Sequence, residues 1–399
     1  MDFSYTTERE EQFRQEFRAW LAVNLAEHRK DFPPSDDELT FHPDRSFESS
    51  LAWHKRMHRG GWVGVHWPRE YGGRSAGLAE EMIFTEELIA AGAPPGVNMI
   101  GLTMVGPAIL RYGTEEQRRR WLPPIPSADE IWCQGFSEPG AGSDLANLST
   151  RAAAEGEHFV VTGQKVWTSN AHRSQMCILL ARTDPAAPRH RGISCLLVDM
   201  RSPGITIRPL IQITGEAEFN EVFFDQVRVP KANLLGPKNG GWEVAITILM
   251  HERTAIGSAM ILHHYIQRLL DLARRTTCDG TKAAADPLLR QELAQIYLEG
   301  RTLRLTGLRY LTRQLRGEPP GPEGSVLKLA MAEAYKKMAQ TAGHILGPAQ
   351  QLWRGTEWAP DGGRWAFQAL YALRFGIAGG TSEVQKNIIG ERILGLPKG

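Results

Sequence analysis

The spacing of apolar residues changes twice along the chain, and these changes restrict its fold more than any other feature. From residue 7 to about 125 the spacing is helical, from about 132 to 235 short β-rich runs replace it, and long helical patterns return from about 240. This order predicts an α+β protein with an N-terminal helical domain over residues 1–130, a β domain over 131–236 and a C-terminal helical domain over 237–399.

Start and stop signals place the helices. Thr7 with Glu10 forms a capping box ahead of an apolar stripe, and Thr114 with Gln117 forms another farther along the chain. Asp286 is a predicted N-cap because Pro287 follows it at the first helical position. The remaining helices are expected at 51–59, 78–91, 287–315, 325–346 with Ser325 as N-cap, and 383–394.

The β domain is predicted from five runs rich in β-branched and aromatic residues. They cover residues 158–162, 165–168, 176–181, 193–198 and 221–229. Gly163 and Gln164 separate the first two runs, so a hairpin turn is predicted there. Pro230 is expected to end the last run.

The composition excludes several classes of function. Lys and Arg total 46 against 45 Asp and Glu, so nothing favours nucleic-acid binding. No apolar run is long enough to span a bilayer, and the N-terminus lacks the pattern of a signal peptide. The four cysteines form no C-x-x-C pair. We expect a cytoplasmic protein without a membrane span or a disulfide framework.

Other short patterns in the sequence do not match a metal-binding or dinucleotide-binding motif. Ala255 occupies the position of the second histidine in a zinc-binding H-E-x-x-H sequence, so no metal site is expected. The Gly140-Ala141-Gly142 run lacks the third glycine of a dinucleotide fingerprint, so NAD is not implied. The remaining aromatic signals, which are Trp53, Trp62, Trp67, His263 and His264, are interpreted as packing residues.

Two segments of the β domain carry the strongest chemical signal. The run from Trp132 to Asp144 combines three glycines and a proline with small hydroxyl side chains, which suits a loop whose backbone N–H groups approach a polar ligand. The run from Val166 to Asn170 places an indole beside two hydroxyls. A flat apolar wall and short hydrogen-bond donors are what the isoalloxazine ring of a flavin needs.

Together the two segments resemble the flavin-binding signatures of the acyl-CoA dehydrogenase family, and the resemblance extends from about residue 5 to about residue 395. It implies that family's fold, with a barrel-like β domain and a C-terminal four-helix bundle, and FAD as cofactor. It places Trp167 against the flavin ring and Ser169 near N5. The residues that it implies for FAD binding are Gln134, Phe136, Ser137, Gly142, Ser143, Trp167, Thr168, Ser169, Arg275, Thr381 and Glu383.

The resemblance also implies the reaction. Family enzymes remove a proton from the α-carbon of an acyl-CoA thioester while a hydride leaves the β-carbon for flavin N5, so one base is required. Many members use the glutamate of a Glu-Gly-Thr sequence, but this chain reads Gly379-Gly380-Thr381. In the isovaleryl- and long-chain-type branch the base lies on a core helix immediately before an arginine, as Glu252 precedes Arg253 here. Glu252 is therefore the predicted catalytic base.

Alternatives remain for these residues. Glu252 also fits a surface carboxylate paired with Arg253, and Glu383 is the main competing base, although an acidic residue there also complements a helix dipole. By resemblance, Ser143, Arg253 and Gly379 face the substrate, with the Gly379 N–H polarising the thioester carbonyl. A branched or bulky acyl group is expected.

Family FAD sites span subunits, so a tetramer is the expected assembly. Arg275 matches an arginine that reaches the FAD pyrophosphate of a neighbouring subunit. Where many members have Gln-x-x-Gly-Gly, this chain reads His344-Ile345-Leu346-Gly347-Pro348, and the proline removes a backbone donor. Either other groups hold the FAD or a different chain completes the site, as in steroid-degrading relatives that form heterotetramers. The Gly-Pro sequence also fits a plain helix end.

The expected function is dehydrogenation of an acyl-CoA to a trans-2-enoyl-CoA, with electrons passed to an electron-transfer flavoprotein. Two alternatives remain. The first is a flavin monooxygenase or oxidase of the same fold, which needs no base at Glu252. The second is a subunit of a hetero-oligomeric acyl-CoA dehydrogenase that supplies FAD contacts to a catalytic partner.

Overall fold

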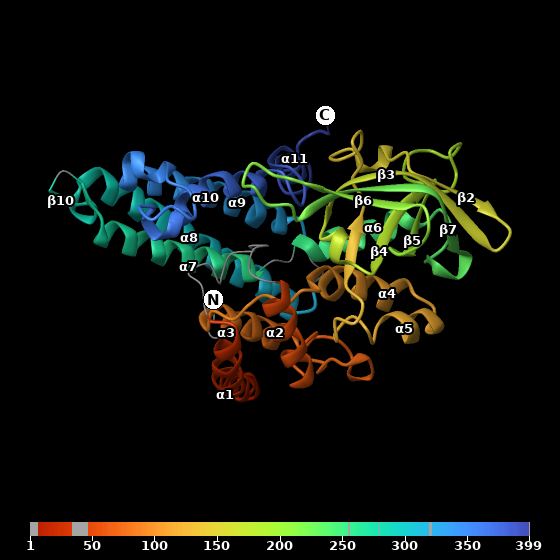
Figure 1. Ribbon diagram of the computed structural model, residues 1–399, viewed down its shortest axis with the longest axis horizontal. Helices are drawn as coiled ribbons and strands as arrows, with labels where there is room; N and C mark the ends of the chain where they lie inside the picture. Colours follow the sequence, from red (N-terminus) through yellow and green to blue (C-terminus); the bar gives the residue numbers. More distant parts are fainter. Residues whose placement is uncertain (1–6, 34–46, 254–255, 279, 319–320, 399) are drawn as a thin grey trace. The chain divides into compact units, whose positions relative to one another are not determined.

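The computed structural model describes residues 7–33, 47–253, 256–278, 280–318 and 321–398 (Figure 1). The chain forms two compact units. One contains the segments Met1–Thr40, Gly77–Ala93 and Arg253–Gly399, and the other contains Phe41–Ala76 and Pro94–Glu252. Within the described ranges, no helix is long and apolar enough to cross a membrane.

In the part of the chain that the structure describes, five α-helices precede the sheet, and two of them begin at predicted capping boxes. They are α1 (Glu8–Asp31), α2 (Phe47–Arg59), α3 (Leu78–Ala90), α4 (Gly106–Tyr112) and α5 (Glu115–Trp121). The predicted capping boxes at the starts of α1 and α5 are both formed. The packing role predicted for Trp53, Trp62 and Trp67 is confirmed, since all three side chains are buried.

A single sheet forms the centre of the second unit, with strand order β6-β7-β3-β2-β4-β5-β8 and β1 added beside β4. Its strands are β1 (Trp132–Gly135), β2 (Arg151–Glu155), β3 (His158–Ser169), β4 (Met176–Arg182), β5 (Ile193–Asp199), β6 (Ile205–Leu210), β7 (Phe219–Pro230) and β8 (Leu234–Leu235). Residues such as Leu179, Leu196 and Val227 fill the core of this domain. The strands β1, β2, β6 and β8 were not predicted, because none of them has a long apolar run.

The hairpin predicted at Gly163-Gln164 is wrong. β3 runs through both residues, and β3 and β7 (Figure 1) pair along nearly their whole length. Between the pairs Val161↔Val227 and Gly163↔Phe224 the register shifts, so the extra residue lies on β7. Gly163 is therefore part of an irregular stretch of strand, and a glycine inside a β pattern marks such an irregularity as readily as a turn.

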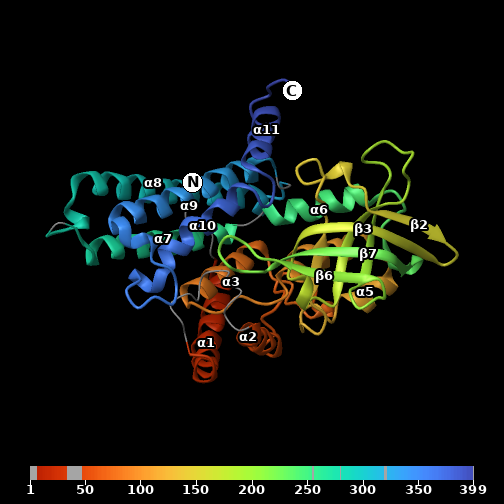
Figure 2. The same ribbon diagram turned by 45° about the horizontal axis from the view of Figure 1, so that its top comes forward.

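The C-terminal part of the chain is helical, apart from a two-stranded ribbon. Its elements are α6 (Gly241–Arg253), α7 (Ile256–Arg275), β9 (Thr277–Cys278), β10 (Thr281–Lys282), α8 (Pro287–Leu315), α9 (Glu323–Leu346), α10 (Arg364–Tyr371) and α11 (Ser382–Arg392). In the first unit α7, α8 and α9 lie side by side, and α11 packs on α9 (Figure 2). The Asp286 cap is confirmed, with its carboxylate accepting from Leu288 and Leu289.

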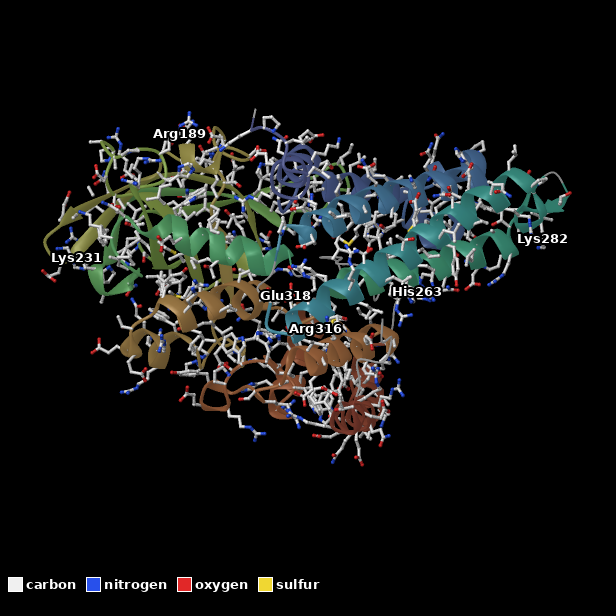
Figure 3. The ribbon with its side chains drawn as sticks, turned by 180° about the vertical axis from the view of Figure 1, so that it is seen from behind. Arg189, Lys231, His263, Lys282, Arg316 and Glu318 are labelled. Atoms are coloured by element: carbon white, nitrogen blue, oxygen red, sulfur yellow. The ribbon has the colours of Figure 1, made fainter. Side chains whose placement is uncertain are left out.

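Two predictions for these helices are wrong. α9 begins at Glu323 after Pro322, so Ser325 lies inside its first turn and is not the N-cap. His263 does not pack in a core: it is exposed on α7 (Figure 3), whereas the half-buried His264 accepts a hydrogen bond from Arg268 Nε at 2.8 Å. A helix of mixed polarity presents adjacent residues to different surroundings, and the sequence pattern did not separate this pair.

Candidate active site

The first predicted flavin-binding loop starts where β1 ends. Gln134 and Ser137 are half-buried, whereas the side chain of Phe136 is buried in the domain, so Phe136 can offer a ligand only its backbone. The Ser137 carbonyl accepts a hydrogen bond from the Val166 N–H at 2.9 Å. This bond joins the loop to β3 one residue before Trp167, so the two segments singled out by the sequence do meet.

Beyond Ser137 the loop closes into a tight turn. The backbones of Glu138 and Ala141 exchange two hydrogen bonds, of 2.9 and 3.0 Å, and enclose Pro139 and Gly140. A Cβ added at Gly140 or Gly142 would meet no atom within 4 Å, so protein packing does not demand either glycine. Gly142 and Ser143 are both exposed. The turn therefore leaves open space beside its backbone, as close approach of a ligand requires.

Asp144, at the end of this loop, forms an ion pair of 3.3 Å with Arg189. Figure 3 labels Arg189. Both side chains are more than half exposed, so the pair contributes little to stability.

Trp167 lies at a bulge of β3. Lys165 pairs with Val222 and Thr168 pairs with Asn220, so two residues of β3 face one residue of β7. Trp167 has a φ of 59°, in the left-handed region that a bulky side chain rarely adopts. Its indole is 57% exposed and touches Phe219 edge-on, with ring centroids 5.9 Å apart. The strand thus turns a large flat ring out of the domain.

The two residues after Trp167 differ in exposure. Ser169 is half-buried, whereas Thr168 is fully buried. The Thr168 carbonyl accepts a hydrogen bond from Asn220 Nδ2 at 3.0 Å, and among the described residues its hydroxyl has no hydrogen-bond partner. An exposed indole beside an open glycine turn fits a flat group such as a flavin.

Neither Glu138 nor Lys165 was predicted as a site residue, yet they form a buried ion pair below this surface. Lys165 Nζ lies 2.8 Å from Glu138 Oε1, with side chains 0% and 4% exposed. Burial alone raises the pKa of Glu138, but the charge and hydrogen bond of Lys165 outweigh it and hold that pKa at about 2. Burial lowers the pKa of Lys165, and the carboxylate opposes this shift. The one sequence signal for this ion pair was a lysine inside a run predicted as a strand.

The second candidate loop belongs to the first unit and precedes α11. Gly379 and Gly380 have φ values of 66° and 91°, which favour glycine. The Gly380 carbonyl accepts a hydrogen bond of 2.6 Å from Lys328 Nζ on α9. Gln385 Nε2 donates to the carbonyls of Gly379 and Gly380, at 3.1 and 3.2 Å. Neither Lys328 nor Gln385 was predicted as a site residue, because both act from outside the glycine sequence.

Thr381 and Glu383 have ordinary helical roles in this structure. Thr381 is the N-cap of α11, and its hydroxyl accepts a hydrogen bond from the Val384 N–H at 3.2 Å. Glu383 lies exposed in the first turn, where a negative charge complements the helix dipole. Its ion pair with Lys386 is 3.9 Å long and exposed, so it holds the carboxylate only weakly.

Arg275 is the last residue of α7 and forms an ion pair with Asp361. Its two terminal nitrogens bind the two carboxylate oxygens of Asp361 at 2.8 and 2.9 Å, and Trp365 Nε1 also donates to that carboxylate at 3.0 Å. The end of α7 lies at the opposite end of the helical bundle from α11 (Figure 1). Within one chain, the structure does not bring Arg275 together with Gly379, Thr381 and Glu383.

Glu252 and Arg253 occupy the last turn of α6. Their side chains lie outside the described part of the structure, so the choice between a catalytic base and a surface ion pair stays open. The departure at 344–348 coincides with the end of α9 at Leu346, where Gly347 has a φ of 56°. The predicted helix end at this Gly-Pro sequence is confirmed.

Comparison with known proteins agrees with this geometry. The chain matches sequence models of the acyl-CoA dehydrogenase N-terminal, middle and C-terminal domains over residues 7–129, 133–227 and 239–394. It is 40% identical over 396 residues to acyl-CoA dehydrogenase IpdE1 of Mycobacterium tuberculosis, covering 97% of this chain and 98% of that protein.

Two solved structures are similar over the full length of this chain and of theirs. They are the Tcur3481-Tcur3483 steroid ACAD, with a TM-score of 0.84 and 30% identity, and the ChsE4-ChsE5 complex from Mycobacterium tuberculosis, with a TM-score of 0.84 and 32% identity. Both alignments cover 100% of each chain. From its sequence, its domain order and its fold, the chain belongs to the acyl-CoA dehydrogenase family of FAD-binding oxidoreductases that act on CH–CH bonds.

Proposed function

We propose that this chain binds FAD and dehydrogenates an acyl-CoA thioester to the trans-2-enoyl-CoA. The observation that carries the proposal is Trp167, which a β-bulge holds at positive φ with its indole exposed beside the Ser137 loop. The exposed indole adds nothing to the hydrophobic core of its domain, and the positive φ is unfavourable. A flat ligand that covers the ring best explains this conformation. When bound, FAD accepts the hydride that leaves the substrate β-carbon.

Glu252 is proposed as the base that takes the α-proton. Removal of the α-proton requires a base, and Gly379 offers no carboxylate. Glu252 lies on α6 immediately before Arg253, in the arrangement of the isovaleryl- and long-chain-type branch. A carboxylate held away from water acquires the raised pKa that removal of a weakly acidic proton needs.

The Gly379 loop is proposed to bind the thioester carbonyl. Lys328 and Gln385 hold the carbonyls of Gly379 and Gly380. These bonds fix the two peptide planes that follow the Gly379 N–H, the group expected to donate to the thioester carbonyl. The loop is therefore rigid before substrate arrives, which suits a group that stabilises developing negative charge.

The proposed substrate is a bulky, ring-bearing acyl-CoA, and the proposed acceptor is an electron-transfer flavoprotein in the cytoplasm. The support for the substrate is the steroid ACAD among the similar structures and the missing side chain at Gly379. Glycine there leaves room beside the reacting carbons.

A second candidate is a subunit of a hetero-oligomeric enzyme. Arg275, the residue expected to reach a neighbouring subunit's FAD, donates from both of its terminal nitrogens to the carboxylate of Asp361. Pro348 lacks the N–H that the usual family sequence would offer at this place. The similar structures include the ChsE4-ChsE5 complex. Flavin stoichiometry and native mass of the purified chain, alone and with co-expressed partners, distinguish a homotetramer from a heterotetramer.

The test is an anaerobic titration of the purified protein with straight-chain, branched and steroid-side-chain acyl-CoAs, followed by flavin absorbance. We expect the ring-bearing thioester to bleach the flavin and Glu252→Gln to abolish bleaching while FAD stays bound. Loss of a required general base lowers the rate by roughly 10²–10⁴-fold or more. Glu243→Gln is the matched control, because Glu243 is an exposed carboxylate on the same helix.

The other outcomes reassign the chemistry. Near-normal bleaching in Glu252→Gln with loss in Glu383→Gln would move the base to α11. Rapid peroxide formation or a hydroxylated product in air would favour the oxidase or monooxygenase alternative. A purified chain that binds no flavin until a partner is supplied would favour the subunit alternative.

A further inference from the structure

The buried ion pair between Lys165 and Glu138 has no part in the chemistry proposed above. Lys165 is the one lysine among the largest fully buried side chains of the described residues. Its ammonium donates to Glu138 Oε1 at 2.8 Å and to the Phe136 carbonyl at 2.9 Å. One side chain on β3 thus holds two points of the loop that follows β1.

Glu138 binds a third segment. Its Oε1 also accepts from the Thr150 N–H at 2.9 Å, and its Oε2 accepts from the N–H and hydroxyl of Ser149 at 2.7 and 2.8 Å. The carboxylate therefore connects the glycine turn, the segment before β2 and the strand β3. All of these bonds lie in one domain and involve groups that are fixed before any ligand binds.

Stability alone does not account for a charged pair in this position. Removing two charges from water carries a penalty that their attraction offsets only partly, and a well-packed apolar pair is often at least as stable. Lys165 is fully buried on β3, as is the apolar Val161 of the same strand, so an apolar side chain is a realistic alternative at this position. Unlike an apolar pair, this ion pair fixes the conformation of the loop after β1 through its hydrogen bonds.

The backbone that this ion pair helps to fix lies around the Trp167 bulge. The next residue, Val166, donates its N–H to the Ser137 carbonyl at 2.9 Å, and Trp167 then adopts its positive φ. Beyond the bulge, Asn220 holds the Thr168 carbonyl. A bulky residue keeps an unfavourable φ only when the surrounding structure leaves it no alternative. Lys165 supplies the fixed point on the N-terminal side of the bulge.

We propose that Lys165 and Glu138 are positioning residues for the isoalloxazine ring: their ion pair fixes the Phe136–Ser137 loop and the Trp167 bulge in the cofactor-binding conformation before FAD arrives. The proposal rests on the proposed function, because it takes the ligand of this surface to be a flavin. Neither side chain touches the flavin, so both act through Ser137 and Trp167.

The experiment compares Lys165→Met with Phe159→Ala. Phe159 is a buried core residue on the same strand, at the end away from the bulge, so its truncation destabilises the domain without cutting an anchor of the loop. For each purified protein, three properties are measured: the midpoint of thermal unfolding, hydrogen exchange of peptides covering 136–150 and 164–169 without FAD, and the dissociation constant for FAD.

We expect Lys165→Met to accelerate exchange in both peptides and to weaken FAD binding by roughly tenfold or more, since tenfold corresponds to the loss of one or two hydrogen bonds. Phe159→Ala should lower the unfolding midpoint but keep its FAD dissociation constant within about twofold of wild type. The visible circular dichroism of bound flavin should change in Lys165→Met alone.

The double variant Lys165→Met/Glu138→Gln keeps the test decisive if Lys165→Met does not fold, because it leaves no unpaired buried charge. We expect it to fold and still to bind FAD weakly, since the Phe136 carbonyl has lost its donor. FAD affinity equal to that of the Phe159→Ala control would overturn the positioning role and leave the proposed function intact. Failure of the wild-type holoenzyme preparation to contain or bind any flavin would instead overturn the proposed function.

Discussion

The loop after β1 and the loop before α11 both present glycines and short hydroxyl side chains, but they are held in different ways. In the first, the glycines Gly140 and Gly142 have no positive φ, and the strain is carried by Trp167 on the adjacent strand. In the second, Gly379 and Gly380 themselves adopt positive φ values. Glycine leaves open space beside the backbone in one loop and permits a left-handed backbone conformation in the other.

The side chains that hold the two loops also differ. The anchors of the first loop, Lys165 and Glu138, are both buried and form a closed network. Those of the second are the buried Gln385 and the partly exposed Lys328, which bind neutral carbonyls. Breaking a buried charged network leaves an uncompensated charge, whereas water can replace a partly exposed donor. We therefore expect the first loop to be the more sensitive to its anchors.

The largest effect is expected from acid. The pKa of Glu138 is about 2, below its ordinary value of 4.5, so the carboxylate stabilises the folded state fully above about pH 4.5 and loses this contribution as the pH falls toward 2. The shift corresponds to about 3 kcal/mol. Urea unfolding of the apoprotein between pH 7 and 3 should show wild type losing stability relative to Glu138→Gln.

Another buried group acts in the same direction and has to be separated. Burial lowers the pKa of His54 to about 4, so its neutral form also stabilises the folded state, and this contribution is lost between about pH 6.5 and 4. Because His54 is present in both proteins, the difference between wild type and Glu138→Gln isolates the carboxylate. A difference that does not change between pH 5 and 3 would show that the buried pair is not charged in the folded protein.

An intermediate effect is expected from adding a methyl group to one glycine of each loop. At Gly380 the φ of 91° disfavours alanine, and the new Cβ would lie 2.7 Å from Gln385 Nε2, so the clamp on the loop has to shift. Gly380→Ala should destabilise the protein by about 1–3 kcal/mol. Gly142→Ala is the matched control: its Cβ meets open space and its φ is not positive, so apoprotein stability should change by less than about 0.5 kcal/mol.

Thermal or urea unfolding of the two apoproteins measures this contrast, and FAD binding adds a second comparison. Gly142→Ala should weaken FAD binding more than it weakens the fold, because the space that it fills is on the ligand side of the loop. Equal destabilisation by the two substitutions would show that the glycines have the same role in both loops.

Much of the fold could be predicted because its signals are local. The Thr7–Glu10 and Thr114–Gln117 boxes lie within one helical turn, and each starts a helix. The three-part order of helices, strands and helices followed from periodicity, and resemblance led to the family. Gly163 shows the limit: whether a glycine in a β pattern is a turn or a strand irregularity depends on the partner strand β7, which lies far along the chain.

The anchors of the candidate site were missed for the same reason. Lys165 within a strand pattern fits a solvent-facing residue, and only its proximity to Glu138 and Phe136 reveals a buried charge. Lys328 reaches the Gly380 carbonyl from a different helix. The residues predicted to touch the cofactor lie in compact sequence motifs, whereas those that hold the loops come from elements that only the folded chain brings together.

The smallest effect is expected from Lys328→Met. This change removes one hydrogen bond to the Gly380 carbonyl, while Gln385 still donates to the same atom, so the free energy of unfolding should fall by about 1 kcal/mol. Lys336→Met on the same helix is the control, because the ion pair of Lys336 with Glu333 is partly exposed and contributes little to stability. If the Gly379 loop binds the thioester carbonyl, Lys328→Met should lower the rate of flavin reduction at saturating substrate and leave the FAD dissociation constant unchanged. Weaker FAD binding with an unchanged rate of flavin reduction would mean that the Gly379 loop holds the cofactor. The two loops would then differ only in how rigidly they are held.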